Sequence, residues 1–258
     1  MRTLSLALIA LLLTAPSNAD EAEPQIKRFI GCPVYRDTDA GRKSGCWLVT
    51  DPASGVQYDV TAARLKPILG QQILVEGVVT ATNDQWCGGI ALQPVDVSVL
   101  PQACKGFVIP AEGYPGRRFS LPAEVLQPTW VPRTLPPPPY DTRQFTIQFE
   151  LNSDFLVYQY AELIIERAVL YAKASKAKSI TITGYAATRE EEVSGQKISE
   201  NLSVAEARAR MIQEAFLRLG IPREAMELKW EGEGPSAPAP EGVLLEAAKR
   251  RAVITIEP

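Results

Sequence analysis

Short runs of alternating hydrophobic and polar residues fill the first half of the chain beyond its N-terminal end. Four such runs lie at 46–49, 57–60, 73–80 and 90–100, with glycine- or proline-containing turn segments between them. Alternation with a period of two is typical of strands that bury one face. The pattern therefore predicts a small all-β domain over residues 25–108.

The pattern changes after residue 141. Alternating positions predict strands at 145–150, 180–184, 226–230 and 253–256, and Trp230 at strand spacing is expected in the core. Apolar residues at helical spacing predict helices at 161–173 and ahead of Gly220, with a short third helix within 242–250. The alternation of strands with helices indicates an α+β domain over residues 142–258, with helices on one face of a mixed sheet.

Two further segments have a distinct composition. Residues 109–141 are rich in proline and include Pro136-Pro137-Pro138-Pro139, which is typical of a semi-rigid extended linker. Residues 1–19 combine Arg2, an apolar run and a small-residue ending, as in a cleaved secretory signal peptide. The apolar run is shorter than the ~20 residues that span a bilayer, so no transmembrane segment is expected in the mature chain.

Composition narrows the function classes. The chain has 258 residues, which fits two domains, and it contains no histidine, which excludes Ser-His-Asp and Cys-His catalysis. Its formal net charge of -3 supplies no general attraction for nucleic acid. No cofactor or metal site is expected, and an enzyme that uses paired carboxylates remains compatible with the composition.

The cysteines Cys32, Cys46, Cys87 and Cys104 all lie in the first half of the chain. In an exported protein an even set of cysteines most simply forms disulfides, and the absence of C-x-x-C pairs and of histidine disfavours zinc. Four cysteines allow three pairings. We expect Cys32 with Cys46 and Cys87 with Cys104.

Two resemblances follow from these residues. The stretch from Gly70 to Leu92 looks like the central strands of an OB-type barrel. From Phe145 to Pro258 the chain resembles the OmpA-like domain family. The residues that carry this second resemblance, in family order, are Gly184-Tyr185, Leu202-Ser203, Gly220-Ile221-Pro222, Gly232-Glu233-Gly234-Pro235 and Arg250-Arg251-Ala252-Val253.

The OmpA-like resemblance implies a peptidoglycan site. In the family an Asp after a Gly-aromatic-Thr strand end and an Arg in the pattern Asn-x-x-Leu-Ser-x-x-Arg-Ala engage the charged ends of the stem peptide. Counting from Gly184 and from Ser203 places Ala187 and Glu206 at these positions, so both are substituted. Ser203 and Glu206 also have the spacing of a helix capping box.

Four arginines are candidates for a relocated cation. Arg189 lies in the loop before the second helix, Arg208 lies two residues after Glu206, and Arg250 and Arg251 form the family's closing pair. A helix turns by ~100° per residue, so Arg208 is expected to point away from the direction of Glu206. For Arg250 and Arg251 a structural ion pair and a ligand contact remain open.

The sequence supports three functional hypotheses. The first is a non-catalytic periplasmic or outer-membrane-associated protein in which the OmpA-like scaffold has altered or lost its affinity for peptidoglycan. The second is a structural subunit that binds other envelope proteins. The third is a carboxylate-dependent glycosidase that acts on wall glycans.

Overall fold

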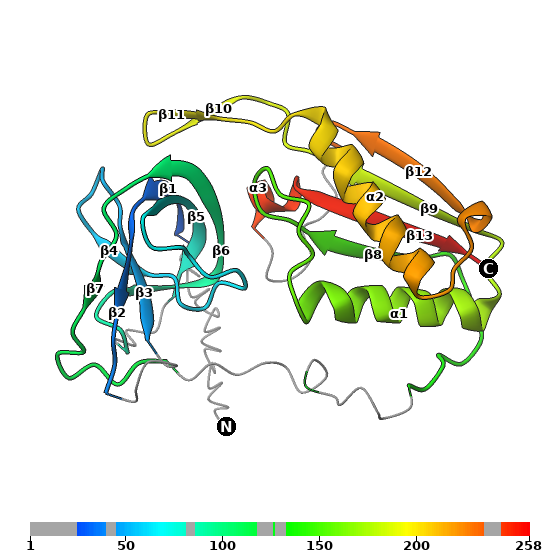
Figure 1. Ribbon diagram of the computed structural model, residues 1–258, viewed down its shortest axis with the longest axis horizontal. Helices are drawn as coiled ribbons and strands as arrows, with labels where there is room; N and C mark the ends of the chain where they lie inside the picture. The colour runs from blue at the N-terminus through cyan, green and yellow to red at the C-terminus, as the bar shows by residue number, and fades with distance from the viewer. Residues whose placement is uncertain (1–24, 40–44, 81–85, 118–125, 127–132, 235–243) are drawn as a thin grey trace, which may run out of the picture.

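The computed structural model describes residues 25–39, 45–80, 86–117, 126, 133–234 and 244–258. The predicted signal peptide and much of the predicted linker lie outside these residues. Two regions, each built around its own sheet, lie next to one another (Figure 1). No helix in the described part of the chain combines the length and the apolar character needed to cross a membrane.

The N-terminal region is a seven-stranded sheet in the order β1-β5-β6-β4-β3-β2-β7. Most neighbours are antiparallel, whereas the pairs β2–β7 and β4–β6 are parallel. The strands are β1 Ile26–Gly31, β2 Pro33–Arg36, β3 Cys46–Thr50, β4 Gln57–Asp59, β5 Gln71–Val79, β6 Ile90–Ala103 and β7 Val108–Ile109.

This sheet is not the closed barrel that the sequence suggested. The outermost strands β1 and β7 do not pair with each other, so the sheet is mixed and open. Period-two alternation specifies which face of a strand is buried but not which strands become neighbours. Its core contains Phe29, Val49, Tyr58, Ile73 and Leu92, all at most 3% exposed.

Both disulfides form, but the predicted pairing was wrong. Cys32 pairs with Cys104 and Cys46 with Cys87, with Cα–Cα distances of 5.9 and 5.6 Å. β1 and β6 flank β5 and are both antiparallel to it. They therefore run in the same direction and terminate at the same end of the sheet, beside the start of β5. Cys32 follows β1 and Cys104 follows β6, which brings them together.

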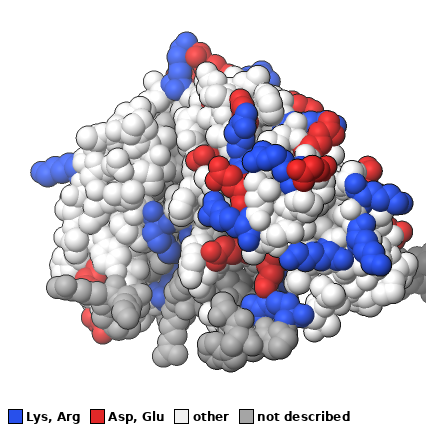
Figure 2. Space-filling model, turned by 45° about the vertical axis from the view of Figure 1, so that its right-hand side comes forward, with Lys and Arg blue, Asp and Glu red and all other residues white. Residues whose placement is uncertain are grey.

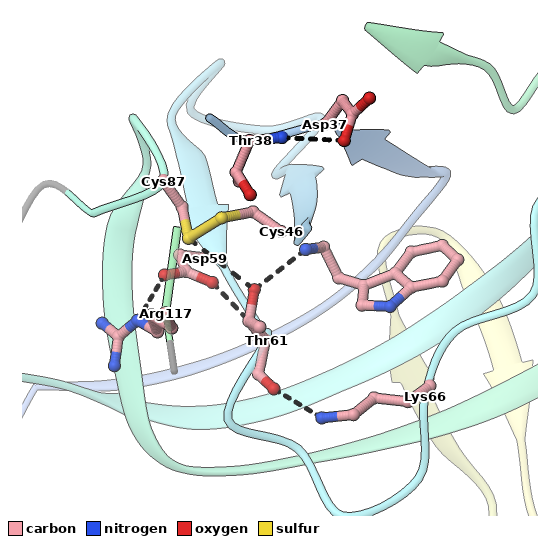
Figure 3. Close-up of a disulfide and its surroundings, with 9 residues drawn as sticks. Asp37, Thr38, Cys46, Asp59, Thr61, Lys66, Cys87 and Arg117 are labelled. Atoms are coloured by element: carbon pink, nitrogen blue, oxygen red, sulfur yellow. Dashed lines mark hydrogen bonds and ion pairs between the residues drawn. A yellow bond between two sulfur atoms is a disulfide. The ribbon is translucent and has the colours of Figure 1, made fainter. Parts of the chain in front are cut away.

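Polar contacts surround the second disulfide. Arg117 Nε donates to the buried Asp59 carboxylate at 2.8 Å, and Asp59 accepts the backbone N–H of Thr61 at 2.9 Å (Figure 3). The Thr61 hydroxyl accepts the Trp47 N–H at 2.9 Å. Two disulfides are typical of an oxidising, extracytoplasmic compartment.

The C-terminal region is a mixed four-stranded sheet in the order β12-β9-β13-β8. β12 is parallel to β9, and the other neighbours are antiparallel. Two long helices pack on one face of the sheet (Figure 1). The elements are β8 Arg143–Gln148, α1 Tyr160–Ser175, β9 Ser179–Tyr185, β10 Glu191–Val193, β11 Gln196–Ile198, α2 Leu202–Arg218, β12 Met226–Glu231, α3 Leu245–Ala248 and β13 Arg251–Glu257, with a 3-10 turn at Arg223–Ala225.

The strands and helices expected in this region are therefore confirmed, and the β10–β11 hairpin is an addition. Alternate residues of the central strands are buried under the helices, as Ile180 and Ile182 of β9 and Ile254 of β13 show. Trp230 is a correction, because its side chain is 41% exposed. It lies near the end of the edge strand β12, where a strand-period position does not guarantee burial.

Gly184 sets the distance between β9 and α2. A Cβ atom at this position would lie 1.9 Å from the backbone oxygen of Ala205 in α2. Backbone atoms of a packed helix cannot move aside cheaply. The glycine that precedes Tyr185 therefore lets the start of α2 approach the end of β9.

We predict that Gly184→Ala lowers the free energy of unfolding by about 3 kcal/mol, since it forces α2 away from the sheet. Urea unfolding followed by circular dichroism measures this change. Thr183→Ala, on the same strand but the opposite face, is the control and should change stability by less than about 1 kcal/mol. Equal effects of the two substitutions would contradict the assigned role of Gly184.

Candidate functional site

Arg208 lies on the buried face of α2. The helix buries Ala205, Arg208, Ala209, Ile212, Gln213 and Phe216, a stripe with the spacing of one helix face. The Arg208 side chain is fully buried, at 0% exposure. A guanidinium that is removed from water must find protein partners for its charge and its N–H groups.

All five N–H groups of the Arg208 guanidinium donate hydrogen bonds. Nε donates to the Ser153 carbonyl at 2.9 Å, and the two terminal nitrogens donate to the carbonyls of Tyr185 at 2.7 Å and Glu150 at 2.9 Å. Each terminal nitrogen also donates to one oxygen of the Glu200 carboxylate. Arg208 thus has no N–H group left for another ligand.

The Glu200 carboxylate also has several hydrogen-bond partners on each side. Besides the two bonds from Arg208, its carboxylate accepts the backbone N–H of Asn152 at 2.7 Å and that of Ala187 at 2.8 Å. A second hydrogen bond joins the same two residues, because the backbone N–H of Glu200 donates to the Ala187 carbonyl at 2.8 Å. A guanidinium and two backbone amides therefore form a carboxylate-binding site, which the chain fills with its own Glu200.

The loop that carries Glu200 extends toward the N-terminal region. Strands β10 and β11 form a hairpin whose two-residue turn, Ser194-Gly195, has positive φ angles of 49° and 75°, as in the turns that favour tight hairpins. The Ser194 hydroxyl accepts the backbone N–H of Ile30 at 3.0 Å. Gln196 Nε2 donates to Gln72 Oε1 at 2.9 Å.

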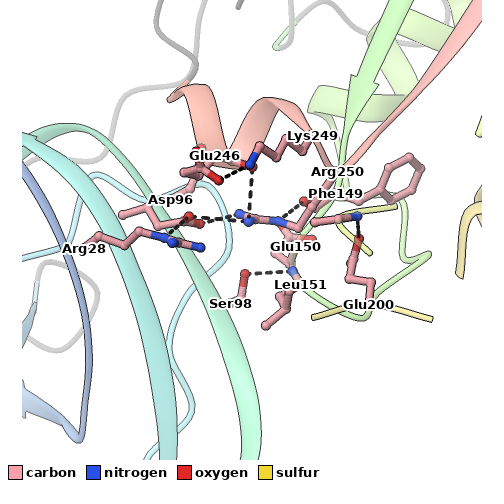
Figure 4. A network of polar contacts seen from close by, with 12 residues as sticks. Arg28, Asp96, Ser98, Phe149, Glu150, Leu151, Glu200, Glu246, Lys249 and Arg250 are labelled. Carbon is pink, nitrogen blue, oxygen red and sulfur yellow. Dashed lines mark hydrogen bonds and ion pairs between the residues drawn. The ribbon is translucent and has the colours of Figure 1, made fainter. Parts of the chain in front are cut away.

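A hydrophobic cluster continues this contact between the regions. It joins residues of the N-terminal sheet with the hairpin and with the loop after β8, and its members are Ile30, Leu74, Leu100, Leu151, Val193 and Ile198. The backbone N–H of Leu151 also donates to the Ser98 hydroxyl at 2.8 Å within the buried contact (Figure 4). The neighbours of Glu200 in sequence and in space thus pack against the N-terminal sheet.

Arg250 forms a second buried ion pair, and this one joins the two regions. Its guanidinium donates to the carboxylate of Glu76 in β5, and both side chains are at most 3% exposed. Burial alone would lower the pKa of Arg250, but the charge and hydrogen bonds of Glu76 outweigh it and raise the pKa. Arg28 Nε donates to the same carboxylate at 3.1 Å. Arg28 also pairs with Glu191 in the hairpin, which extends the network.

Glu150 is the carboxyl group at this contact that has no full set of partners. It is 7% exposed, and among the described residues its Oε2 atom has no hydrogen-bond partner. Burial raises the pKa of Glu150, the nearby charge of Asp96 raises it further, and Arg64 and Arg250 act in the opposite direction.

A small cavity lies at this contact. Its volume is about 10 Å³, which holds about one water molecule, and its lining includes Ala187, Arg189 and Arg250. This cavity is too small to hold a peptide or a sugar.

The structure separates the residues that the sequence proposed as a site. Glu206 is on the solvent side of α2, where its carboxylate accepts two hydrogen bonds from Arg210, at 2.9 and 2.6 Å. The predicted capping box is wrong, because Asn201 is the N-cap and its side chain accepts the Ser203 N–H at 2.9 Å. α2 begins two residues earlier than the capping box required, so Ser203 is already inside its first turn.

The four candidate cations have different environments. Arg208 and Arg250 are buried in ion pairs, whereas Arg189 is exposed in the loop and its backbone N–H donates to Glu233. Arg251 stacks its guanidinium 4.4 Å from the centre of the Tyr185 ring and donates to the Ala248 carbonyl. Of these four, Arg208 is the one that shares a carboxylate with the backbone N–H of Ala187.

Two signals in the sequence point to Arg208. Counting the pattern Asn-x-x-Leu-Ser-x-x-Arg-Ala from Asn201, instead of from Ser203, puts its Arg-Ala on Arg208-Ala209. Arg208 also falls on the apolar stripe of an amphipathic helix, where an arginine requires a buried partner. No spacing rule identifies Glu200, because its role depends on the path of the hairpin.

We predict that Glu200→Ala lowers the free energy of unfolding by about 3–5 kcal/mol, because it leaves the buried charge of Arg208 without a counter-ion. Thermal and urea unfolding measure the change. Glu206→Ala is the matched control, since it removes an exposed ion pair from the same helix and should cost less than about 1 kcal/mol. A loss below about 1 kcal/mol for Glu200→Ala would contradict the role of Glu200 as the buried counter-ion of Arg208.

Because the pKa of Glu150 is raised, the stability of the protein should depend on pH through this residue. A carboxyl whose pKa is raised on folding retains a proton that the unfolded chain has released, so its contribution to stability is lost as the pH rises through the raised pKa. Glu150→Gln removes this titration. The variant and the unmodified protein should be equally stable below the usual pKa of 4.5, and the variant should become the more stable one toward neutral pH.

Urea unfolding at a series of pH values tests this prediction. Glu214→Gln, on the exposed face of α2, serves as the control for the loss of a carboxylate and should change stability little. A constant difference between Glu150→Gln and the unmodified protein at all pH values would refute the assigned titration.

Comparisons with known proteins gave matches among solved structures alone: no protein-family model and no curated protein matches the chain. The OmpA-like domain of FopA1 from Francisella tularensis is 21% identical and matches with a TM-score of 0.36, over 44% of this chain and 71% of that one. The cell wall anchor of the T6SS from Pseudomonas aeruginosa is 18% identical, with a TM-score of 0.35 over 45% and 82%. The peptidoglycan-associated lipoprotein from Burkholderia pseudomallei is 23% identical, with a TM-score of 0.33 over 44% and 90%. In structure, the C-terminal part of the chain is similar to OmpA-like domains.

Proposed function

We propose that this chain is an exported, non-catalytic cell-envelope protein in which the OmpA-like region keeps its peptidoglycan site closed with the carboxylate of Glu200. Three observations support the proposal: the ordered sequence motifs of the C-terminal region, the two disulfides, and the occupied carboxylate site. The disulfides and the predicted signal peptide favour a periplasmic location at the wall or the outer membrane.

The occupied site carries the proposal. In the resembling family an arginine at the start of the helix engages a charged end of the stem peptide, and we assign this position to Arg208. Glu200 takes every contact that a ligand carboxylate would make with Arg208 and with the Ala187 N–H. Ala187 replaces the family's Asp, so the partner for a ligand amine is missing as well. Peptidoglycan affinity through this site is therefore lost while Glu200 remains in place.

Charge and composition support the non-catalytic assignment and the class of partner. The sequence lacks histidine, and the buried carboxylates of Asp59, Glu76 and Glu200 each pair with an arginine. On the face seen in Figure 2, basic and acidic side chains are mixed, with no extended surface of one sign. Such a surface suits proteins better than nucleic acid.

A second candidate is a structural subunit that binds other envelope proteins. The contact between the two regions favours it, because a buried ion pair, a hydrophobic cluster and two side-chain contacts from the hairpin fix one arrangement of the sheets. A rigid pair of regions presents a constant surface to a partner. Co-purification of a stoichiometric envelope protein under gentle extraction would support this candidate.

Sedimentation of the full chain with purified peptidoglycan sacculi tests the first proposal. The unmodified protein should stay in the supernatant. The double variant Ala187→Asp/Glu200→Ser restores an Asp and frees Arg208, and its sedimented fraction should rise about tenfold, as expected for one recovered charge-assisted contact pair.

The control is Ala187→Asp/Glu206→Arg, which changes charge near the same helix but leaves Glu200 on Arg208 and should stay in the supernatant. Circular dichroism confirms that each variant is folded before sedimentation. If the unmodified protein sediments as strongly as the freed variant, the site is not closed by Glu200 and the proposal fails.

A further inference from the structure

One face of the N-terminal sheet meets the C-terminal region. Successive side chains of a strand point to opposite faces, and Phe29, Ile73 and Val97 point into the N-terminal core. The residues that alternate with them in β1, β5 and β6 point to the other face, where they contact the C-terminal region. We refer to this face as the docking face. The residues that make its contacts are Arg28, Ile30, Gln72, Leu74, Glu76, Ser98 and Leu100.

The β10–β11 hairpin is attached to the docking face. It forms a two-stranded sheet of its own and does not join the four-stranded sheet of its region. It reaches across to the N-terminal sheet in Figure 1, where Ser194 accepts the Ile30 N–H and Gln196 donates to Gln72. The Val193 side chain is 5% exposed and belongs to the hydrophobic cluster on this face. Polar and apolar contacts thus both hold the hairpin on the docking face.

A short connection joins the hairpin to the Arg208 site. Ile198 ends β11 and packs in the same cluster, and a single residue separates it from Glu200. Two residues of extended chain span at most about 7 Å. Movement of Ile198 away from the docking face therefore moves the Glu200 backbone as well. At the start of β10, Glu191 pairs with Arg28 of the docking face and also with Lys249 of its own region.

The loop after β8 attaches the other side of the site to the same face. Leu151 packs in the cluster, and its backbone N–H donates to the Ser98 hydroxyl at 2.8 Å. The next residue, Asn152, donates its N–H to the Glu200 carboxylate at 2.7 Å. Glu200 and Asn152 are thus each within two residues of a side chain that packs on the docking face.

We propose that the docking face controls the Arg208 site through the hairpin. While the hairpin is docked, Glu200 stays on Arg208, and when the hairpin is released, the guanidinium becomes available to an external carboxylate. This inference rests on the closed site proposed above and adds the element that regulates it. Because release admits water to the pair, separating the two charges costs less than in the buried site. Coupling between two sites is reciprocal, so a carboxylate bound to Arg208 disfavours docking of the hairpin.

Hydrogen exchange of single backbone amides in the full chain, followed by NMR, tests the inference. The Ile30 N–H donates to Ser194 and reports docking, whereas the Ala187 N–H donates to Glu200 and reports closure of the site. Val193→Asp places a carboxylate in the apolar contact, so both amides should exchange at least about tenfold faster than in the unmodified protein. Glu200→Ala, which lacks the carboxylate, sets the upper limit for the Ala187 amide.

Two further variants separate release of the hairpin from other effects. Leu100→Asp introduces the same charge from the opposite side of the contact and should accelerate the same two amides. Val108→Asp adds the charge at a side chain that is 60% exposed on β7 and should leave both amides unchanged. The Ile182 amide, in the interior strand β9, should keep its protection in every variant. A docking variant that unfolds is recognised by this amide, and the other docking variant then decides.

Two results would overturn the inference. If Ile30 exchanges faster in both docking variants while Ala187 stays protected, Glu200 remains on Arg208 without help from the docking face. If Ile30 itself stays protected in both variants, the docking face does not hold the hairpin through this cluster.

Sedimentation with purified sacculi separates this inference from the proposed function. In the Ala187→Asp background, Val193→Asp should raise the sedimented fraction about as much as Glu200→Ser does. If Glu200→Ser has this effect and Val193→Asp does not, control by the docking face is refuted although the site binds. If neither has it, yet Val193→Asp alone accelerates exchange of the Ala187 amide, the docking face controls the site and the peptidoglycan assignment is refuted.

Discussion

The ion pair between Arg208 and Glu200 is the interaction on which the arrangement of the C-terminal region depends. The Arg208 guanidinium donates hydrogen bonds to three backbone carbonyls, two in the loop after β8 and one at the end of β9. The Glu200 carboxylate accepts hydrogen bonds from backbone N–H groups of the same two segments. Because both groups are buried, neither can exchange its partners for water without a large penalty. Two oppositely charged side chains therefore fix the relative positions of two loops and the start of α2.

The contact between the two regions follows from this arrangement. The segments that the pair immobilises are the ones that meet the N-terminal sheet: Leu151 follows Glu150, and the β10–β11 hairpin precedes Glu200. Their apolar side chains complete one buried cluster with Ile30, Leu74 and Leu100. The site and the contact between the sheets are thus joined through the same segments, and the Arg250–Glu76 pair reinforces the contact from the residue just before β13.

Sequence patterns predicted the local structure well and the partners of each element poorly. The periodicities at Ile180–Gly184 and Val253–Ile256 correspond to β9 and β13, because burial of one face determines a period of two. The disulfide pairing and the open N-terminal sheet depend instead on which strands become neighbours, which periodicity does not encode. For the same reason Arg208 could be identified from its place on an apolar stripe, whereas Glu200 and Glu76 could not. Their importance comes from contacts across 8 and 174 residues of sequence.

The two buried pairs are consistent with the closed site that we propose. Arg208 and Arg250 both match positions of the OmpA-like sequence pattern, and each is neutralised by a carboxylate of the chain itself. Glu200 follows the β10–β11 hairpin and Glu76 lies in the N-terminal sheet, two additions to the four-stranded core. A buried arginine is stable only with a counter-ion, so an internal carboxylate makes the closed arrangement independent of any ligand. The same additions that dock the two regions thus remove the need for an external anion.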